Sequence, residues 1–178
     1  WEAELDAWPQ ERDPWSLEVA KDSPAMHPRQ MLRELEKALP TDAMVSTDIG
    51  NICSVANSYL RFDRPRSFFA AMSFGNCGYA FPAIIGAKLA APERPAVAYV
   101  GDGAWGMSFG ELLTCVREKI PVTAVVFHNR QWGAEKKNQV DFYGNRFLGV
   151  NLDKQPSWAA VAKAMGADRS CAWPGAEI

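Results

Sequence analysis

The sequence predicts an α/β domain with a mainly parallel sheet and helices on both faces. Two apolar runs carry this prediction, residues 96–100 and 122–127. Nearly uninterrupted β-rich runs are typical of parallel strands that are buried on both faces. Between them, Ser108 and Glu111 have the spacing of a capping box, which predicts a helix over 112–119 that Pro121 ends. This order of strand, helix and strand predicts a parallel crossover.

The elements before residue 96 fit the same architecture. Pro28 is predicted to begin a helix, because apolar residues then recur on one helical face: Met31, Leu32, Leu35, Ala38 and Leu39. Residues 43–47 are predicted to form the first strand, which ends at Asp48, and a helix is expected from Asn51 to about residue 60. Asp48 is expected either to cap that helix or to contact a cofactor. Residues 80–87 are predicted to form a core helix.

The chain after residue 133 is more polar. Residues 135–139 are expected to form either an exposed polar helix or a cover over a site, where Lys136 or Lys137 would meet a sulfonate or phosphate. Ser157 is predicted to cap a last helix that ends at Gly166. We expect residues 1–22 to be an interdomain linker, 23–167 to be the cofactor-binding domain and 168–178 to be a tail without an assigned structure.

Composition limits the classes of function. Of the 178 residues, 48% are hydrophobic and 22% are charged, and the formal net charge is −2 without a block of like charges. Such a chain is typical of a soluble globular domain, and nothing in it favours nucleic-acid or membrane binding. The four cysteines lack Cys-x-x-Cys spacing, which argues against a zinc site. Their scatter among apolar residues predicts a reducing compartment and a cytoplasmic location.

Two oxygen-bearing side chains follow the paired strands. Asp102 stands between Gly101 and Gly103 after the first strand, and Asn129 follows the second. Because ligands of open parallel sheets bind beyond the carboxyl ends of strands, we expect both side chains at one edge. Mg²⁺ prefers oxygen ligands and shares its coordination with phosphate and water. The pattern therefore predicts a magnesium and diphosphate site, and the alternative for Gly-Asp-Gly is a plain turn.

Gly-Asp-Gly followed by a helix, a strand and Asn resembles the diphosphate-binding signature of the thiamine diphosphate enzymes. In that family the second strand ends in Asn-Asn, whereas this chain has His128 and Asn129. The resemblance implies thiamine diphosphate and Mg²⁺ as cofactors. It also implies that Asp102, the Asn129 side chain and the Gln131 backbone oxygen hold the metal. The role of His128 is left open.

The resemblance extends to the loops at residues 48–51 and 73–82, which are similar to cofactor-facing loops of acetolactate-synthase-type enzymes. Cys77 occupies the position of a bulky apolar residue, commonly Met, that supports the bent cofactor. The expected cofactor-binding residues are Gly50, Asn51, Gly75, Asn76, Cys77, Gly101, Asp102, Gly103, Ala104, Trp105, Asn129, Gln131, Trp132 and Gly133.

Residues 72–80 and 127–139 are more specifically similar to the sulfoacetaldehyde acetyltransferase group of this family. That similarity implies sulfoacetaldehyde and phosphate as substrates, with acetyl phosphate and sulfite as products. It further implies that the catalytic glutamate lies on a pyrimidine-binding domain outside this chain, that a central domain is also missing, and that the parent is a homodimer or homotetramer. The alternatives are an acetolactate synthase, a sulfopyruvate or phosphonopyruvate decarboxylase, or a non-catalytic phosphate or nucleotide binder.

Overall fold

A four-stranded parallel sheet forms the centre of the molecule. The computed structural model describes residues 27–57, 59–154 and 157–168. The strands are β2 (Phe68–Ala70), β1 (Met44–Thr47), β3 (Ala96–Gly101) and β4 (Thr123–Phe127), in this spatial order, and every neighbouring pair is parallel. The predicted parallel α/β sheet is confirmed.

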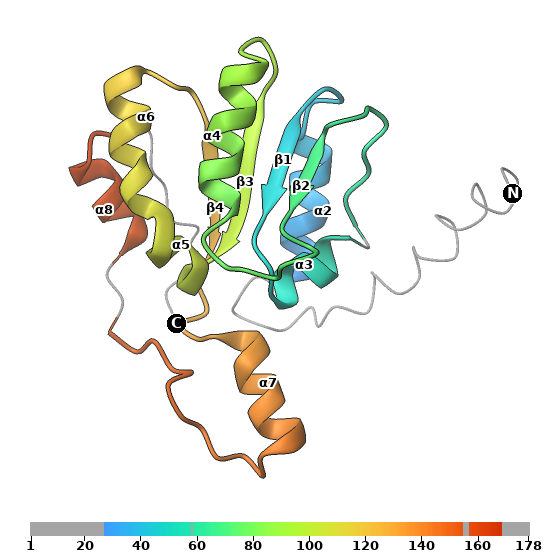
Figure 1. Cartoon of the computed structure of the whole chain (residues 1–178), viewed down its shortest axis with the longest axis vertical. Helices are drawn as coiled ribbons and strands as arrows, with labels where there is room; N and C mark the ends of the chain where they lie inside the picture. The colour runs from blue at the N-terminus through green and yellow to red at the C-terminus, as the bar shows by residue number, and fades with distance from the viewer. Residues whose placement is uncertain (1–26, 58, 155–156, 169–178) are drawn as a thin grey trace, which may run out of the picture.

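Helices cover both faces of the sheet (Figure 1). Two of them, α2 (Pro28–Ala38) and α3 (Asn51–Ala56), lie on one face. On the other face lie α4 (Ala80–Ala90), α5 (Asp102–Ser108), α6 (Leu112–Glu118) and α8 (Trp158–Ala164). A short 3₁₀ turn, η1 (Phe109–Glu111), joins α5 to α6, and α7 (Gly133–Phe142) extends beyond the carboxyl ends of the strands.

The alternation of side chains along the strands divides the interior into two cores. Val45 and Tyr99 pack with Leu32 under α2 and α3. Met44 and Val100 lie on the opposite face, in the core that α4 to α6 cover. The central strands are therefore buried on both sides, which is why they read as nearly continuous apolar runs.

Two predicted helix starts are confirmed. Pro28 is the first residue of α2, where the missing N–H costs nothing. The Ser157 hydroxyl accepts a hydrogen bond from the Ala160 amide at 3.3 Å and caps α8.

The prediction that Ser108 and Glu111 form a capping box is wrong. The chain is already helical from Asp102, so no free helix end exists at Ser108 for a side chain to cap. The Ser108 hydroxyl is instead buried without a hydrogen-bond partner, and the Glu111 carboxylate accepts a bond from the Thr114 hydroxyl at 2.9 Å.

Two further expectations are corrected in length or number. The helix after Gly50 ends at Ala56 instead of near residue 60. Strand β2 was not predicted, because its three residues are too few to show a periodicity.

The proposed linker at 1–22 lies outside the described residues, as does the tail beyond Asp168, so the domain limits stay predictions. Every helix in the described part of the chain is too short or too polar to traverse a lipid bilayer.

Two cations tie together the amino ends of the strands. Lys88 is 8% exposed, and its ammonium donates to the carbonyl oxygens of Pro92 and Arg94 at 2.8 and 2.7 Å. The Arg94 guanidinium donates to the Asp42 carbonyl at 2.8 Å and to the Ser67 hydroxyl at 2.6 Å. These bonds connect the segments that precede β1, β2 and β3.

Candidate functional site

The carboxyl edge of the sheet gathers the four loops that contain the sequence-predicted site residues. The loops follow β1, β2, β3 and β4 in turn, and the parallel pairing brings all four to the same edge. Gly101 pairs with Phe127 in the register of β3 and β4, so Asp102 and His128 leave the sheet side by side. The predicted meeting of the Asp102 and Asn129 loops is confirmed.

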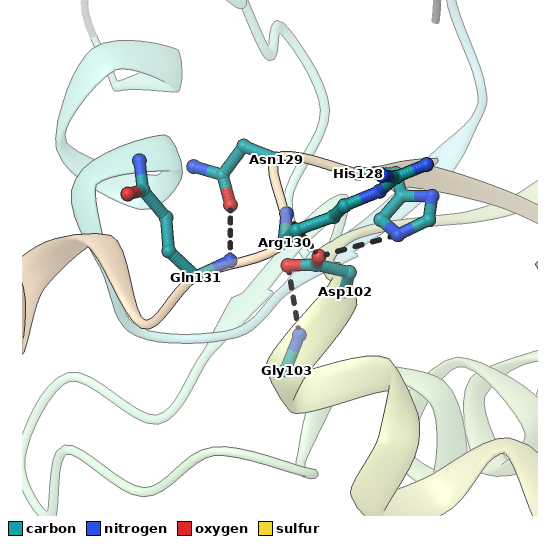
Figure 2. Close-up of polar contacts among 6 residues, drawn as sticks. All are labelled: Asp102, Gly103, His128, Asn129, Arg130 and Gln131. Carbon is teal, nitrogen blue, oxygen red and sulfur yellow. Dashed lines mark hydrogen bonds and ion pairs between the residues drawn. The ribbon is translucent and has the colours of Figure 1, made fainter. Parts of the chain in front are cut away.

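Asp102 lies at the centre of this edge as the first residue of α5 (Figure 2). Its side chain is 1% exposed. One carboxylate oxygen, Oδ1, accepts a hydrogen bond from the Gly103 amide at 3.0 Å, and Oδ2 accepts one from the Arg130 amide at 2.7 Å. The second bond ties the loop after β4 directly to the start of α5.

Burial dominates the electrostatics of Asp102. Desolvation raises the pKa of its carboxyl above the ordinary value. The Arg130 amide hydrogen bond opposes this rise most strongly, followed by the charge of His128 and the Gly103 amide. The His128 Nε2 atom lies 3.7 Å from Asp102 Oδ2. A buried carboxylate of this kind gains from any further cation that binds to it.

Asn129 lies next to Asp102 on a tight turn. Its side-chain Oδ1 accepts a hydrogen bond from the Gln131 amide at 3.2 Å, and Arg130 between them has a left-handed φ of 56°. An amide oxygen has two lone pairs, so this bond leaves one available. The turn also directs the Arg130 amide to Asp102.

Two glycines allow the loops to approach closely. A Cβ atom on Gly103 would lie 2.9 Å from atoms of the Trp132 ring, and one on Gly133 would lie 3.3 Å from the Asn51 amide nitrogen. Gly133 is also near Asn129, whose amide nitrogen would lie 3.7 Å from the same added atom. The structure therefore brings the loops after β1, β3 and β4 together.

The loop after β2 joins the edge through Asp48. Asp48 Oδ1 accepts hydrogen bonds from the amides of Tyr79 and Ala80 at 2.7 and 3.1 Å and so caps α4. The sequence had left open a cap on the helix after Gly50 or a contact with a cofactor. The Cys77 thiol lies 3.6 Å from the Ile49 carbonyl oxygen. Burial raises the pKa of this thiol, with the negative charge of Asp48 adding to the rise.

Other predicted residues lie at the margins of the site. The Trp105 ring is buried and packs edge-on against Phe81 at 4.8 Å, in the core that α4 to α6 cover, and Ala104 is also buried. Gly75 faces open space, and neighbouring Phe74 is 88% exposed.

The structure separates the two lysines that the sequence left equivalent. Lys137 is exposed and pairs with Asp141 on α7 at 2.6 Å. Lys136 turns back to the site loop, where its ammonium donates to the side-chain oxygens of Gln131 and Asn151 at 2.9 and 3.2 Å. Of the two, only Lys136 places its charge beside a predicted metal-binding residue.

Sequence reasoning missed the groups that hold the site loop in shape. Leu152 donates from its amide to the Arg130 carbonyl at 2.8 Å, Trp132 donates to the Val150 carbonyl at 2.8 Å, and Gln131 forms an isolated antiparallel bridge with Asn151. These are backbone contacts, so no residue type in the sequence signals them.

The candidate metal ligands at this edge of the sheet are all oxygen atoms. A carboxylate at Asp102, an amide oxygen at Asn129 and backbone carbonyls in the turn are the ligands that Mg²⁺ prefers. No cluster of three or more His, Cys, Asp or Glu side chains suited to a metal occurs among the described residues. The residues present therefore fit a hard cation that completes its coordination with phosphate oxygens and water.

Comparison with known proteins identifies similar sequences. The chain is 69% identical to a sulfoacetaldehyde acetyltransferase of Castellaniella defragrans, over 94% of this chain and 29% of that protein. It is 67% identical to the enzyme of the same name from Alcaligenes xylosoxydans xylosoxydans, with the same coverage. The chain thus spans about 29% of the length of these relatives.

A solved structure shares the fold. It is the thiamine diphosphate-dependent 4-hydroxybenzoylformate decarboxylase of Rhodococcus jostii RHA1, which matches with a TM-score of 0.76 and 22% identity over 84% of this chain and 28% of that one. The model of the C-terminal TPP binding domain of thiamine pyrophosphate enzymes matches residues 48–175. This chain therefore belongs to the thiamine pyrophosphate enzyme family, and within it to the domain that binds thiamine pyrophosphate (thiamine diphosphate).

Proposed function

We propose that this chain is the thiamine diphosphate- and Mg²⁺-binding domain of a sulfoacetaldehyde acetyltransferase. The observation that carries the metal site is the convergence of Asp102 and Asn129 at the carboxyl edge of the sheet, joined by the bond from the Arg130 amide. The relatives at 67% and 69% identity support the substrate assignment.

Asp102, the Asn129 side-chain oxygen and the Gln131 backbone oxygen are the proposed metal ligands. In this role Asp102 supplies the negative charge, and the Asn129 turn sets the direction of the neighbouring backbone carbonyls. Gly101 and Gly103 let the backbone approach a diphosphate without a Cβ in the way. Bound thiamine diphosphate supplies the nucleophilic carbon and the electron sink, and the protein orients it.

The remaining proposed cofactor contacts come from the other three loops. Gly50 and Asn51 follow β1 and adjoin Gly133 through the Asn51 amide. Gly75, Asn76 and Cys77 follow β2 and join the edge through the Cys77 contact to Ile49. The other members of this proposed set are Ala104, Trp105 and Trp132.

The proposed reaction converts sulfoacetaldehyde and phosphate into acetyl phosphate and sulfite. We place the glutamate that activates the cofactor on a pyrimidine-binding domain outside this chain, so the chain alone is expected to be inactive. Its span of 29% of the relatives supports a parent with further domains.

Sulfite release tests this proposal. The longer protein of which we propose this chain is a part would be incubated with sulfoacetaldehyde, phosphate, Mg²⁺ and thiamine diphosphate. Phosphate-dependent formation of sulfite and acetyl phosphate is expected. Carbon dioxide release from pyruvate or sulfopyruvate, without sulfite, would move the function to an acetolactate synthase or a decarboxylase.

Assembly is the second part of the proposal. Three large apolar side chains of the described residues are strongly exposed, Phe74 at 88%, Leu148 at 85% and Phe142 at 76%. Phe74 lies in the loop after β2, and Phe142 and Leu148 lie at the end of α7 and in the segment after it, beyond the carboxyl edge of the sheet. Their exposure supports burial against other domains in a homodimer or homotetramer. Light scattering of the longer protein is expected to give a dimer or tetramer, and a monomer would refute this part.

A cytoplasmic location is the last part of the proposal. Cys53, Cys77 and Cys115 are all free thiols, which supports a reducing compartment. Fractionation of the source cells is expected to recover the protein with the cytoplasmic enzymes, and recovery outside the cytoplasm would contradict it.

A further inference from the structure

His128 has a buried ring nitrogen that lacks a partner. Its Nε2 atom is inaccessible and has no hydrogen bond, although the side chain as a whole is 19% exposed. A buried donor or acceptor left unpaired costs free energy, so a native protein normally gives it a function or a partner. The polar atom it faces is Asp102 Oδ2, at 3.7 Å.

The geometry around Asp102 leaves room for this partner. Oδ1 and Oδ2 each accept one backbone hydrogen bond, from Gly103 and Arg130 respectively. Each carboxylate oxygen has two acceptor positions, so Oδ2 can accept a second bond. His128 approaches from the end of β4, whereas Gly103 approaches from within α5 (Figure 2). Backbone amides from α5 and from the loop after β4 thus bind the carboxylate, and His128 Nε2 lies 3.7 Å from Oδ2 without a hydrogen bond.

We propose that His128 is a positioning residue for the Asp102 carboxylate. Its Nε2 lies 3.7 Å from Oδ2, beyond hydrogen-bond distance, and a small approach of the ring would let an Nε2–H donate to Oδ2 when the metal is bound. Groups that hydrogen-bond a metal-ligating carboxylate fix its rotation, and their loss weakens metal affinity by about 10-fold to 100-fold. His128 would act on the metal only through Asp102. The inference rests on the proposed metal site at Asp102.

Two substitutions separate positioning from simple packing. His128→Gln places an amide N–H at nearly the position of Nε2, so it keeps the donor. His128→Leu has comparable bulk and no donor. If the ring served only to fill space, Leu would be the better replacement, because the site lies among partly buried atoms. His128→Asn moves the donor, since its shorter amide overlaps the Nδ1 position and leaves the Nε2 position empty.

Metal affinity provides the test. Mn²⁺ would be titrated into the longer protein with thiamine diphosphate present, and the bound ion followed by electron paramagnetic resonance. His128→Leu is expected to weaken Mn²⁺ binding by about 10-fold or more and to alter the spectrum of the bound ion. His128→Asn is expected to behave similarly, and His128→Gln to bind as the wild type does. Wild-type affinity in both His128→Leu and His128→Asn, which leave the Nε2 position without a donor, or equal losses in Gln and Leu, would overturn the proposal.

The readout does not depend on turnover. A wild-type protein that binds Mn²⁺ but releases no sulfite would refute the proposed reaction and leave the His128 test intact. Sulfite release combined with unchanged Mn²⁺ affinity in His128→Leu would refute the role of His128 alone. Mn²⁺ affinity that Asp102→Asn leaves unchanged would overturn both the metal site and the positioning role.

Discussion

Buried polar side chains are hydrogen-bonded less completely at the carboxyl end of the sheet than Lys88 and Arg94 are at the amino end. At the amino end, the Lys88 ammonium donates to two carbonyl oxygens, and Arg94 bonds three neighbouring groups. At the carboxyl end, Asp48 Oδ2 and His128 Nε2 are buried without a partner. Both ends are built from parallel strands of the same sheet, so the strands themselves do not cause the difference.

This difference indicates that the polar groups at the amino end stabilise the fold, whereas those at the carboxyl end serve binding. Hydrogen bonds at the amino end hold together the segments that enter the sheet. At the carboxyl end, burial raises the pKa of both Asp48 and Asp102, which means that the site holds its carboxylates at a cost. A bound cation would recover part of that cost at Asp102. The comparison predicts that substitutions at the two ends affect different measurements.

The largest effect is expected from Asp102→Ala. Removing the carboxylate removes the proposed charged metal ligand, so Mg²⁺-dependent binding of thiamine diphosphate should weaken by at least about 100-fold, the upper range for loss of a supporting group. Isothermal titration calorimetry of the longer protein measures this. Asp102→Asn should give a similar loss while keeping an oxygen for the backbone amides.

Asp63→Asn is the matched control, since it makes the same chemical change at an exposed position. It should leave cofactor affinity unchanged. Unchanged binding in Asp102→Ala would remove the carboxyl end from consideration as the metal site and end the comparison.

Lys88→Met tests the amino end. The substitution keeps the aliphatic stem and leaves the Pro92 and Arg94 carbonyl oxygens without their donor. Both bonds are only partly buried. An unpaired buried group costs about 1–3 kcal/mol, so loss of the two bonds should lower the free energy of unfolding by about 1–3 kcal/mol in total. Urea unfolding of the 178-residue chain measures this. Cofactor affinity should not change, and a loss of affinity equal to that of Asp102→Ala would show that the two ends are not separable.

Gly103→Ala tests the close approach at the carboxyl end. The added Cβ would lie 2.9 Å from the Trp132 ring, so the ring or α5 must move, at a cost of about 1–3 kcal/mol. Gly86→Ala is the control within a helix, because nothing lies within 4 Å of its added Cβ, and it should stabilise the chain by about 0.5–1 kcal/mol. Thermal unfolding of both variants checks the two signs. Destabilisation by Gly86→Ala, or none by Gly103→Ala, would contradict the packing argument.

The sequence predicted most of the sheet because burial on both faces leaves a direct trace in composition. Strands β3 and β4 were identified from their apolar runs, and the meeting of Asp102 with the Asn129 loop followed from their parallel order. Strand β2 was not predicted because its three residues are too few to show a periodicity. The capping box at Ser108 failed because a local motif cannot show that the chain is already helical upstream.

The sequence predicted which side chains lie at the site, but it did not predict the backbone hydrogen bonds that hold them in place. Gly103 and Asp102 are residue types with known preferences, so the pattern of the loop indicated them. The Arg130 amide bond to Asp102 depends on a left-handed residue and on the pairing of Gln131 with Asn151. Any residue except proline could supply that amide, so nothing in the sequence marks it. Asp48 shows the same limit, since its carboxylate caps a helix 32 positions away.

The smallest predicted effect concerns Asp48 and pH. Burial raises its pKa in the folded chain, whereas in the unfolded chain the group titrates near the ordinary value of 3.8. As pH rises past that value, the unfolded chain loses this proton first, so the free energy of unfolding falls until the raised pKa of the folded state is passed. The contribution is therefore full at low pH and lost as pH increases, with a slope of at most about 1.4 kcal/mol per pH unit.

Asp48→Asn keeps an oxygen for the Tyr79 and Ala80 amides and removes the titration, so the stability of this variant should decline less over this range. Urea unfolding at a series of pH values without metal ions measures both slopes. Because Asp102 shifts in the same direction, the slope should decrease without vanishing, and equal slopes in the two proteins would show that Asp48 is ionised at no cost in the fold.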